Sequence, residues 1–79
     1  MIDTRKTGER IKKLCREKGI PAKRIMEMMG FTSPNAVYKW FSGKSIPSID
    51  NLLILAEALG TTVEDLIVET DEEEKNSKL

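Results

Sequence analysis

Four polar side chains at helical spacing carry the most interpretable chemistry of this sequence: Asn35, Tyr38, Lys39 and Ser42. Their spacing places them on one face of a single helix, because residues three and four apart are neighbours on a helix surface. An Asn amide can hydrogen-bond adenine through N6 and N7, and a Lys ammonium can reach a guanine or a phosphate. Tyr38 can contact a base, a thymine methyl group or a phosphate. We therefore expect this face to bind base edges, with Ala36 as a further base contact.

Each of these residues also has an ordinary structural explanation. Asn35 can be an exposed residue at a helix start, and Tyr38 can pack partly against the preceding part of the chain. Ser33 can bond a phosphate, but Ser33 and Pro34 equally fit an N-cap followed by a first helical residue, where proline loses no hydrogen bond. The functional interpretation rests on the whole face and not on one side chain.

Basic and hydroxyl residues flank this segment on both sides. Lys23 and Arg24 precede it, and Lys44 and Ser45 follow it. Together with Ser33 and Ser42, these residues are predicted to contact DNA phosphates. Phosphate contacts position a protein on DNA without conveying sequence information. A single Lys or Arg fits a solvated surface equally well, so the set is more informative than its members.

The formal net charge of the chain is zero, but the charges are unevenly distributed. Residues 1–44 hold eleven Lys/Arg and four Asp/Glu, a net charge of +7. Residues 45–68 carry a net charge of −4 and residues 69–79 a net charge of −3. A local basic face attracts phosphate whatever the total charge is, although an ordinary solvated surface explains the charge pattern alone equally well.

Apolar residues recur at helical spacing in five segments, and no run alternates with the period of two expected for a strand. The first helix is predicted over residues 4–18, with Ile11, Leu14 and Cys15 as its apolar stripe. Gly19 ends it as a C-terminal cap. We interpret Cys15 as a small packing residue and not as a redox switch.

Two short helices joined by a glycine-containing turn follow. The first of them occupies about residues 21–30, with Met28 at the margin of its apolar face and near the surface. The second begins at Ser33 and Pro34 and runs to Ser42. Its other face carries apolar side chains that predict core packing and not stacking on single-stranded nucleic acid, namely Val37, Trp40 and Phe41.

The fourth helix is predicted to start after a capping Ser48 and to end at Gly60. Its predicted apolar face consists of Ile49, Leu52, Leu53, Ala56 and Leu59. A short fifth helix follows Thr62 and extends to about Val68. Residues 69–79 are acidic and almost free of apolar side chains, which predicts a disordered tail, with a partner-binding or DNA-mimicking segment as the alternative. The expected architecture is an all-α, five-helix domain over residues 1–68 with a tail over residues 69–79.

At this point the sequence resembles the Cro and lambda-repressor type of helix-turn-helix regulators of bacteria and phages. The matching stretches are residues 8–14, 18–20, 37–40, 43–44, 47–48, 51–60 and 63–66, together with Gly30. The resemblance covers about residues 5–68 and rests on the ordered series of stretches and not on any single one. It implies a compact five-helix domain whose third helix reads DNA in the major groove.

Three departures from the family pattern concern the same part of the chain. Ala22 stands where the family usually has Gln, which braces the first contacting residues and touches phosphate. Met26 stands where Ala is usual, and the turn after Gly30 is one residue longer than usual. These departures make a transfer of family contacts less direct near Thr32 and Ser33.

Several classes of protein do not fit the sequence. One Cys and no His give no disulfide, no zinc finger and no Cys/His or Ser/His catalytic pair, so we expect no enzyme, no metal and no cofactor. The longest apolar stretch, residues 52–56, is too short to span a membrane, and the first residues lack the apolar core of a secretory signal. We expect a cytoplasmic protein of a bacterium or phage that has no evident small-molecule ligand.

The sequence therefore predicts a small transcriptional regulator, a repressor in our interpretation, that binds double-stranded operator DNA through residues 33–42. A homodimer through helices four and five is expected, on apolar side chains that exceed one inner face: Ile54, Leu55, Ile67 and Val68. The alternative is an adaptor or antitoxin-like module that keeps the fold without binding an operator. An RNA-binding domain would need an exposed aromatic platform, which the sequence does not predict.

Overall fold

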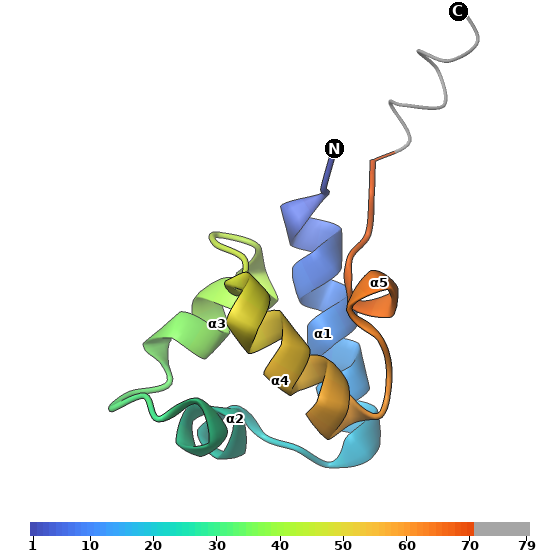
Figure 1. Ribbon diagram of the computed structural model, residues 1–79. Helices are drawn as coiled ribbons and strands as arrows, with labels where there is room; N and C mark the ends of the chain where they lie inside the picture. Colours follow the sequence, from blue (N-terminus) through green and yellow to red (C-terminus); the bar gives the residue numbers. More distant parts are fainter. Residues whose placement is uncertain (71–79) are drawn as a thin grey trace, which may run out of the picture.

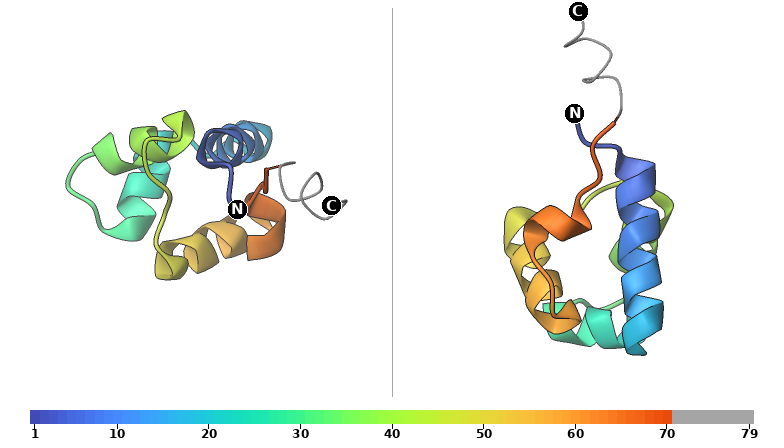
Figure 2. Two further views of the ribbon diagram at one scale, coloured as in Figure 1. Left: turned by 90° about the horizontal axis from the view of Figure 1, so that it is seen from above. Right: turned by 90° about the vertical axis from the view of Figure 1, so that its right-hand side faces the viewer.

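Five helices form the regular structure of residues 1–70, the part of the chain that the computed structural model describes. They are α1 (Thr4–Lys18), α2 (Ala22–Met29), α3 (Asn35–Ser42), α4 (Ile49–Leu59) and α5 (Val63–Leu66). The right-hand view of Figure 2 shows α1 on one side of the molecule and α4 with α5 on the other, with α2 beneath them, and Figure 1 labels all five helices. The predicted all-α, five-helix architecture is confirmed. No helix within this part of the chain is both long and apolar enough to cross a membrane.

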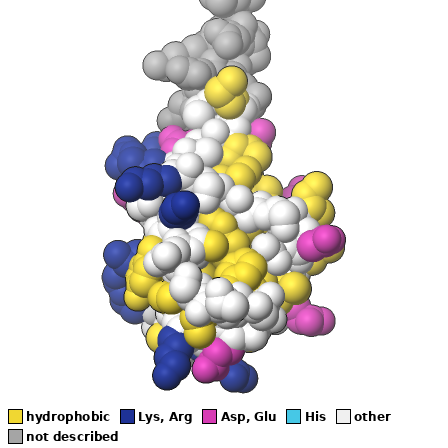
Figure 3. All heavy atoms as spheres, turned by 90° about the vertical axis from the view of Figure 1, so that its left-hand side faces the viewer, with side chains coloured by type: hydrophobic (Ala, Val, Ile, Leu, Met, Phe, Trp, Pro, Cys, Tyr) yellow, Lys and Arg dark blue, Asp and Glu magenta, His cyan; other side chains and the backbone are white. Residues whose placement is uncertain are grey.

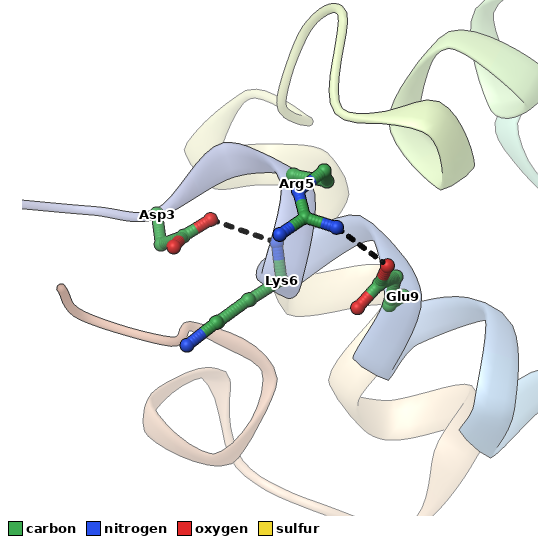
Figure 4. Close-up of polar contacts among 4 residues, drawn as sticks. All are labelled: Asp3, Arg5, Lys6 and Glu9. Atoms are coloured by element: carbon green, nitrogen blue, oxygen red, sulfur yellow. Dashed lines mark hydrogen bonds and ion pairs between the residues drawn. The ribbon is translucent and has the colours of Figure 1, made fainter.

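Local side-chain chemistry explains where the helices begin and end. The Asp3 carboxylate accepts a hydrogen bond of 2.9 Å from the Lys6 backbone N–H and so caps α1, and Arg5 pairs with Glu9 one turn along the helix (Figure 4). The predicted caps of α4 and α5 are confirmed, since Ser48 accepts from the Asn51 N–H and Thr62 from the Asp65 N–H. The first four helices each end at a glycine, as predicted.

Three helix boundaries differ from the predictions by one or two residues. α2 begins at Ala22, and Pro21, which was predicted to open it, occupies the N-cap position. α3 begins at Asn35 and not at Pro34, and Pro34 occupies the N-cap position. The Ser33 hydroxyl still accepts a hydrogen bond of 3.4 Å from the Asn35 N–H, so the predicted capping role is displaced by one residue. α5 ends at Leu66, because the backbone is already extended at Ile67. The extended segment leads the chain back along α1.

The helices enclose one hydrophobic core, made of Ile11, Cys15, Ile25, Val37, Trp40, Leu52, Leu55, Ala56, Leu59 and Leu66. Val37 and Trp40 bring α3 into this core, as predicted, and Phe41 packs against it partly buried. The Trp40 ring meets Phe31 edge to face at 5.8 Å, which ties the turn before α3 to the helix itself. Met28 is half-buried against the core, which agrees with its predicted place at the margin of the apolar face of this helix.

The predicted apolar face of α4 is partly wrong. Leu55 is fully buried, whereas Ile49 is 76% exposed and Leu53 is 56% exposed. Residues 52–56 are all apolar, so the sequence does not define which of them faces inward. Packing on the other helices selects Leu52, Leu55, Ala56 and Leu59 for the core.

Two glycines allow α1 to lie directly against the end of α3. A Cβ atom at Gly8 would stand 2.1 Å from the Trp40 carbonyl oxygen and 2.7 Å from the Phe41 carbonyl oxygen. A Cβ atom at Gly43 would stand 2.6 Å from the Arg5 Cα, and Gly43 has a φ of 81°, which few other residues adopt. The backbone of α1 therefore packs directly on the backbone at the end of α3, and this contact fixes the position of α3.

The two ends of the described chain lie side by side (Figure 1). The Asp3 N–H donates to the Val68 carbonyl at 2.8 Å, and Ile2 pairs with Glu69 in an isolated antiparallel bridge. The buried Thr7 hydroxyl accepts a 3.0 Å hydrogen bond from the Val68 N–H. Glu69 thus contacts the folded domain, although the tail was predicted to begin there. Residues 71–79, the rest of that predicted tail, lie outside the described residues.

Candidate nucleic-acid interface

The polar face of α3 points away from the core. Asn35, Tyr38, Lys39 and Ser42 are all exposed, and Tyr38 is 56% exposed. Ala36 is half-buried, at the margin between this face and the core. An outward polar face next to an inward apolar face is the arrangement that a groove-binding helix requires.

A hollow of about 510 Å³ collects five of the residues predicted to contact DNA. Ser33, Asn35, Ala36 and Lys39 line it from the turn and α3, and Ser45 lines it from the loop that follows. Phe31 and Thr32 complete its wall. Neither residue was predicted to contact DNA. Residues that are separate in the sequence thus face one space at the surface.

Two serines near α3 differ in the hydrogen bonds that they have available. The Ser33 oxygen accepts from the Asn35 N–H, which leaves its own hydroxyl hydrogen free to donate to a phosphate, so capping and phosphate binding are compatible. The Ser42 hydroxyl donates to the Lys39 carbonyl at 3.2 Å. Ser42 must therefore exchange this bond before it can donate to a phosphate.

Two aromatic side chains fix the outer surface of α3. The Tyr38 ring meets the Phe41 ring edge to face, with 6.2 Å between the centroids and 77° between the planes. Such a pair contributes about 0.5–1.5 kcal/mol beyond simple burial. Because Phe41 packs against the core, this contact restricts the exposed Tyr38 ring to the outer face.

The predicted flanking cations are all exposed. Lys23 and Arg24 lie in the first turn of α2, and Lys44 follows the end of α3. Arg24 forms an ion pair of 3.7 Å with Glu27, in which both side chains are largely exposed. An exposed pair of this kind contributes little, so a phosphate can compete for the guanidinium.

A second hollow, of about 330 Å³, lies on the other flank of α3. It is lined by Lys12 of α1, by Ala22 at the start of α2, and by Tyr38, Phe41 and Ser42 of α3. Lys12 was not among the residues predicted to contact DNA. The sequence shows a small residue at Ala22, but no local pattern shows that Lys12 lies across the hollow from it.

The uneven charge of the sequence becomes a separation in space. Figure 3 shows Lys and Arg side chains gathered along the edge where α1 lies and Asp and Glu side chains toward the edge where α4 lies. Of the described residues, α1 alone carries seven Lys/Arg and α4 carries none. The basic side of the molecule is therefore next to the polar face of α3.

Cys15 lies in the core and takes no part in this surface. It is 3% exposed, and burial raises the pKa of its thiol from 9.0 to about 11. The thiolate is the reactive form of cysteine, so this thiol is poorly suited to nucleophilic or redox chemistry at neutral pH. Its expected role as a small packing residue is consistent with this place.

Comparison with known proteins agrees with this geometry. A family model described as Helix-turn-helix matches residues 11–66, which include α2, α3 and the turn between them. The crystal structure of the restriction-modification controller protein C.AhdI from Aeromonas hydrophila is similar, with a TM-score of 0.71 and 28% sequence identity over 81% of this chain and 96% of that chain. A sequence comparison with curated proteins finds no match.

Proposed function

Because the chain belongs to the helix-turn-helix family of the Cro and lambda-repressor type, and is a DNA-binding transcriptional regulator, we propose how its surface contacts an operator. The outer face of α3 enters the major groove. Asn35 and Lys39 hydrogen-bond base edges, and Tyr38 and Ala36 make the nearby base or thymine-methyl contacts. The observation that carries this assignment is the hollow that gathers Ser33, Asn35, Ala36, Lys39 and Ser45 at one exposed surface.

Phosphate contacts on both flanks position the domain on the duplex. On the α2 side they are assigned to Lys23 and Arg24, and on the α3 side to Lys44 and Ser45. Ser33 and Ser42 add hydroxyl contacts close to the recognition helix. These groups set affinity and register, whereas the base contacts set sequence preference.

Selection of binding sites from random duplexes, followed by gel-shift assays at several salt concentrations, tests this function. We expect an enriched sequence and a logarithmic affinity that falls with the logarithm of salt at about 0.9 per phosphate neutralised. Failure to enrich any sequence, together with a flat salt dependence, contradicts it and favours the adaptor or antitoxin-like alternative.

We further propose that the protein acts as a repressor in the bacterial cytoplasm. A small domain that occupies a promoter excludes polymerase by its volume, without any contact to polymerase. A promoter fused to a reporter gene and carrying the selected site should lose expression when the protein is produced. A rise in expression would identify an activator instead.

A homodimer through the outer face of α4 is the proposed assembly. This face exposes Ile49, Leu53 and Ile54, and the exposed Ile46 lies in the loop that precedes α4. Of the residues predicted for the dimer surface, only Ile54 belongs to this face. Leu55 is fully buried, and Ile67 and Val68 are half-buried in the extended segment after α5. A dimer would place two α3 helices on half-sites one helical turn apart and so bind a two-fold symmetric operator.

Sedimentation equilibrium tests the dimer. The wild type should associate in the micromolar range, and Leu53→Lys should be monomeric, because it places a charge in the apolar face. Glu17→Gln, which changes the net charge equally at an exposed position of α1, outside the proposed interface, should leave the association unchanged. A wild type that is monomeric at high concentration, both free and on DNA, contradicts the proposed assembly.

A further inference from the structure

The hollow between α1 and α3 suggests a DNA contact that the family comparison does not supply. It joins three helices: Lys12 comes from α1, Ala22 from α2, and Tyr38, Phe41 and Ser42 from α3. Tyr38 and Ser42 also belong to the exposed polar face of α3. The hollow is therefore continuous with the proposed DNA-binding surface.

The lining of the hollow has two chemical characters. Half-buried Phe41 and Ala22 supply apolar contacts, and both pack against the core. Lys12 and the hydroxyls of Tyr38 and Ser42 supply polar groups next to these apolar contacts. One sugar-phosphate unit has the matching chemistry, because its deoxyribose carbons can rest on apolar atoms while its phosphate accepts hydrogen bonds.

Lys12 is available to an anion from outside the molecule. The ion pairs within residues 1–70 join Arg5 to Glu9 and Arg24 to Glu27, and neither includes Lys12. Its side chain is exposed on the face of α1 that borders α3. Lys12 thus combines a positive charge, no carboxylate partner in the described chain and a place beside the recognition helix.

The dimensions of the major groove place a backbone at this hollow. A helix with its side chains is about 10–12 Å across, and the major groove is about 12 Å wide, so a phosphate backbone runs close to each flank of α3. The hollow at Ser33 and Lys39 lies on one flank and the hollow at Lys12 on the other. With α3 in the major groove, the hollow at Lys12 therefore faces one DNA strand, and Ser33 and Ser45, which line the other hollow, face the opposite strand.

We infer that Lys12 is a phosphate-contacting residue, and that the hollow beside it receives one sugar-phosphate unit of the operator. This inference rests on the proposed binding of α3 in the major groove. The small Ala22 leaves the hollow open, and the lysine of the neighbouring helix supplies the donor. The contact adds affinity and fixes the register of α3, and it carries no sequence information.

Lys12→Gln tests the inference, with Lys13→Gln as the matched control. Lys13 is equally exposed but lies on the side of α1 shared with Arg10, whose guanidinium donates to the Asp65 carbonyl of α5. Lys12→Gln should weaken binding to operator and to random duplex by the same factor and lower the salt slope by about 0.9. Lys13→Gln should keep the wild-type slope, and Lys12→Arg should restore most of the lost affinity.

A duplex with single neutral methylphosphonate substitutions locates the contact. One substitution should weaken binding of the wild type and have no effect on Lys12→Gln, because both remove the same charge interaction. Thermal unfolding should give equal stabilities for both Gln variants, since both lysines are exposed.

The possible failures are distinguishable. If the wild type binds its operator normally but the salt dependence of binding is the same for Lys12→Gln and Lys13→Gln, this inference alone is overturned. A loss on operator but not on random duplex overturns the phosphate assignment in favour of a base contact. A wild type without salt-dependent DNA binding overturns the proposed function and this inference together.

Discussion

α3 and α4 pack apolar stripes on the same core and differ in what they present to solvent. α3 buries Val37 and Trp40 and exposes hydrogen-bonding side chains such as Asn35 and Lys39. α4 buries four apolar residues and exposes further large apolar side chains, including Ile49 at 76% and Leu53 at 56%. Figure 3 shows the related separation of charge between the side of α1 and the side of α4.

This difference separates the residues that the fold requires from the residues that binding requires. The inner faces are interchangeable in chemistry, because any well-packed apolar residue of suitable volume can fill a core. The outer faces contribute little to folding and so report on partners. A polar outer face beside a basic helix suits DNA, and an apolar outer face suits a protein surface.

The largest effect is expected from a comparison of Leu53 and Leu55, which lie on the exposed and the buried face of α4. Leu55→Ala should lower the free energy of unfolding by about 2–5 kcal/mol, because it empties a fully buried position. Leu53→Ala should change it by no more than about 0.5 kcal/mol in the monomer. Urea denaturation at low protein concentration measures both. Equal losses for the two variants would mean that α4 is rotated from the orientation described above.

The next test concerns what holds α3 in place. Gly8→Ala should lower the free energy of unfolding by about 3 kcal/mol, although alanine is the better helix former, because the new Cβ meets backbone carbonyls of Trp40 and Phe41. Gly19→Ala is the matched control, where no atom lies within 4 Å and only the φ of 70° opposes the substitution. It should cost about 1–2 kcal/mol. A Gly8→Ala variant as stable as the wild type would exclude the close approach of α1 and α3.

The outer face of α3 is tested by binding and not by stability. Asn35→Ala and Lys39→Ala should each reduce operator affinity by about 1–3 kcal/mol if they read bases, and should leave unfolding almost unchanged because both side chains are exposed. Titration of operator and random duplexes at one salt concentration measures this. Equal losses on both duplexes would reassign the residue to the phosphate backbone.

A dependence of stability on pH is expected from the core that α3 and α4 share. Well below pH 9 the Cys15 thiol is neutral in both the folded and the unfolded chain, so it does not make stability depend on pH. Between pH 9 and about 11 the unfolded chain releases this proton and the folded chain retains it, because burial raises the pKa to about 11. Stability should therefore fall by about 2 kcal/mol over this range.

Cys15→Ala provides the comparison for this pH effect. The variant keeps every other ionisable side chain of the wild type and loses only the contribution of the thiol. Its free energy of unfolding should therefore decline less steeply above pH 9. Identical slopes for both proteins would show that the thiol is not buried in the folded state.

Local signals in the sequence were sufficient to predict most of the helices and the polar face of α3. Glycines and capping side chains mark helix ends through interactions within a few residues, and these operate wherever the segment lies. The separation of Asn35 and Lys39 from Val37 and Trp40 follows in the same way from the 3.6-residue period of a helix. The predicted boundary was wrong by one residue, since Pro34, expected as the first helical residue, occupies the N-cap position of α3.

The residues that no local pattern could place depend on contacts between distant segments. The apolar run at residues 52–56 has no period, so only packing decides that Leu55 faces inward and Leu53 outward. The Ile2–Glu69 bridge and the contact of Gly8 with α3 join residues far apart in the chain.

The sequence by itself determined the five helices, the family and the polar face that α3 presents, because these follow from local capping, periodicity and an ordered series of short motifs. The tertiary structure alone decided which face of α4 is exposed and that Lys12 lies across a hollow from Ala22 and Ser42. The physical reason is that a helix fixes the relative directions of its own side chains, whereas the rotation and spacing of one helix against another are fixed only when all five pack together.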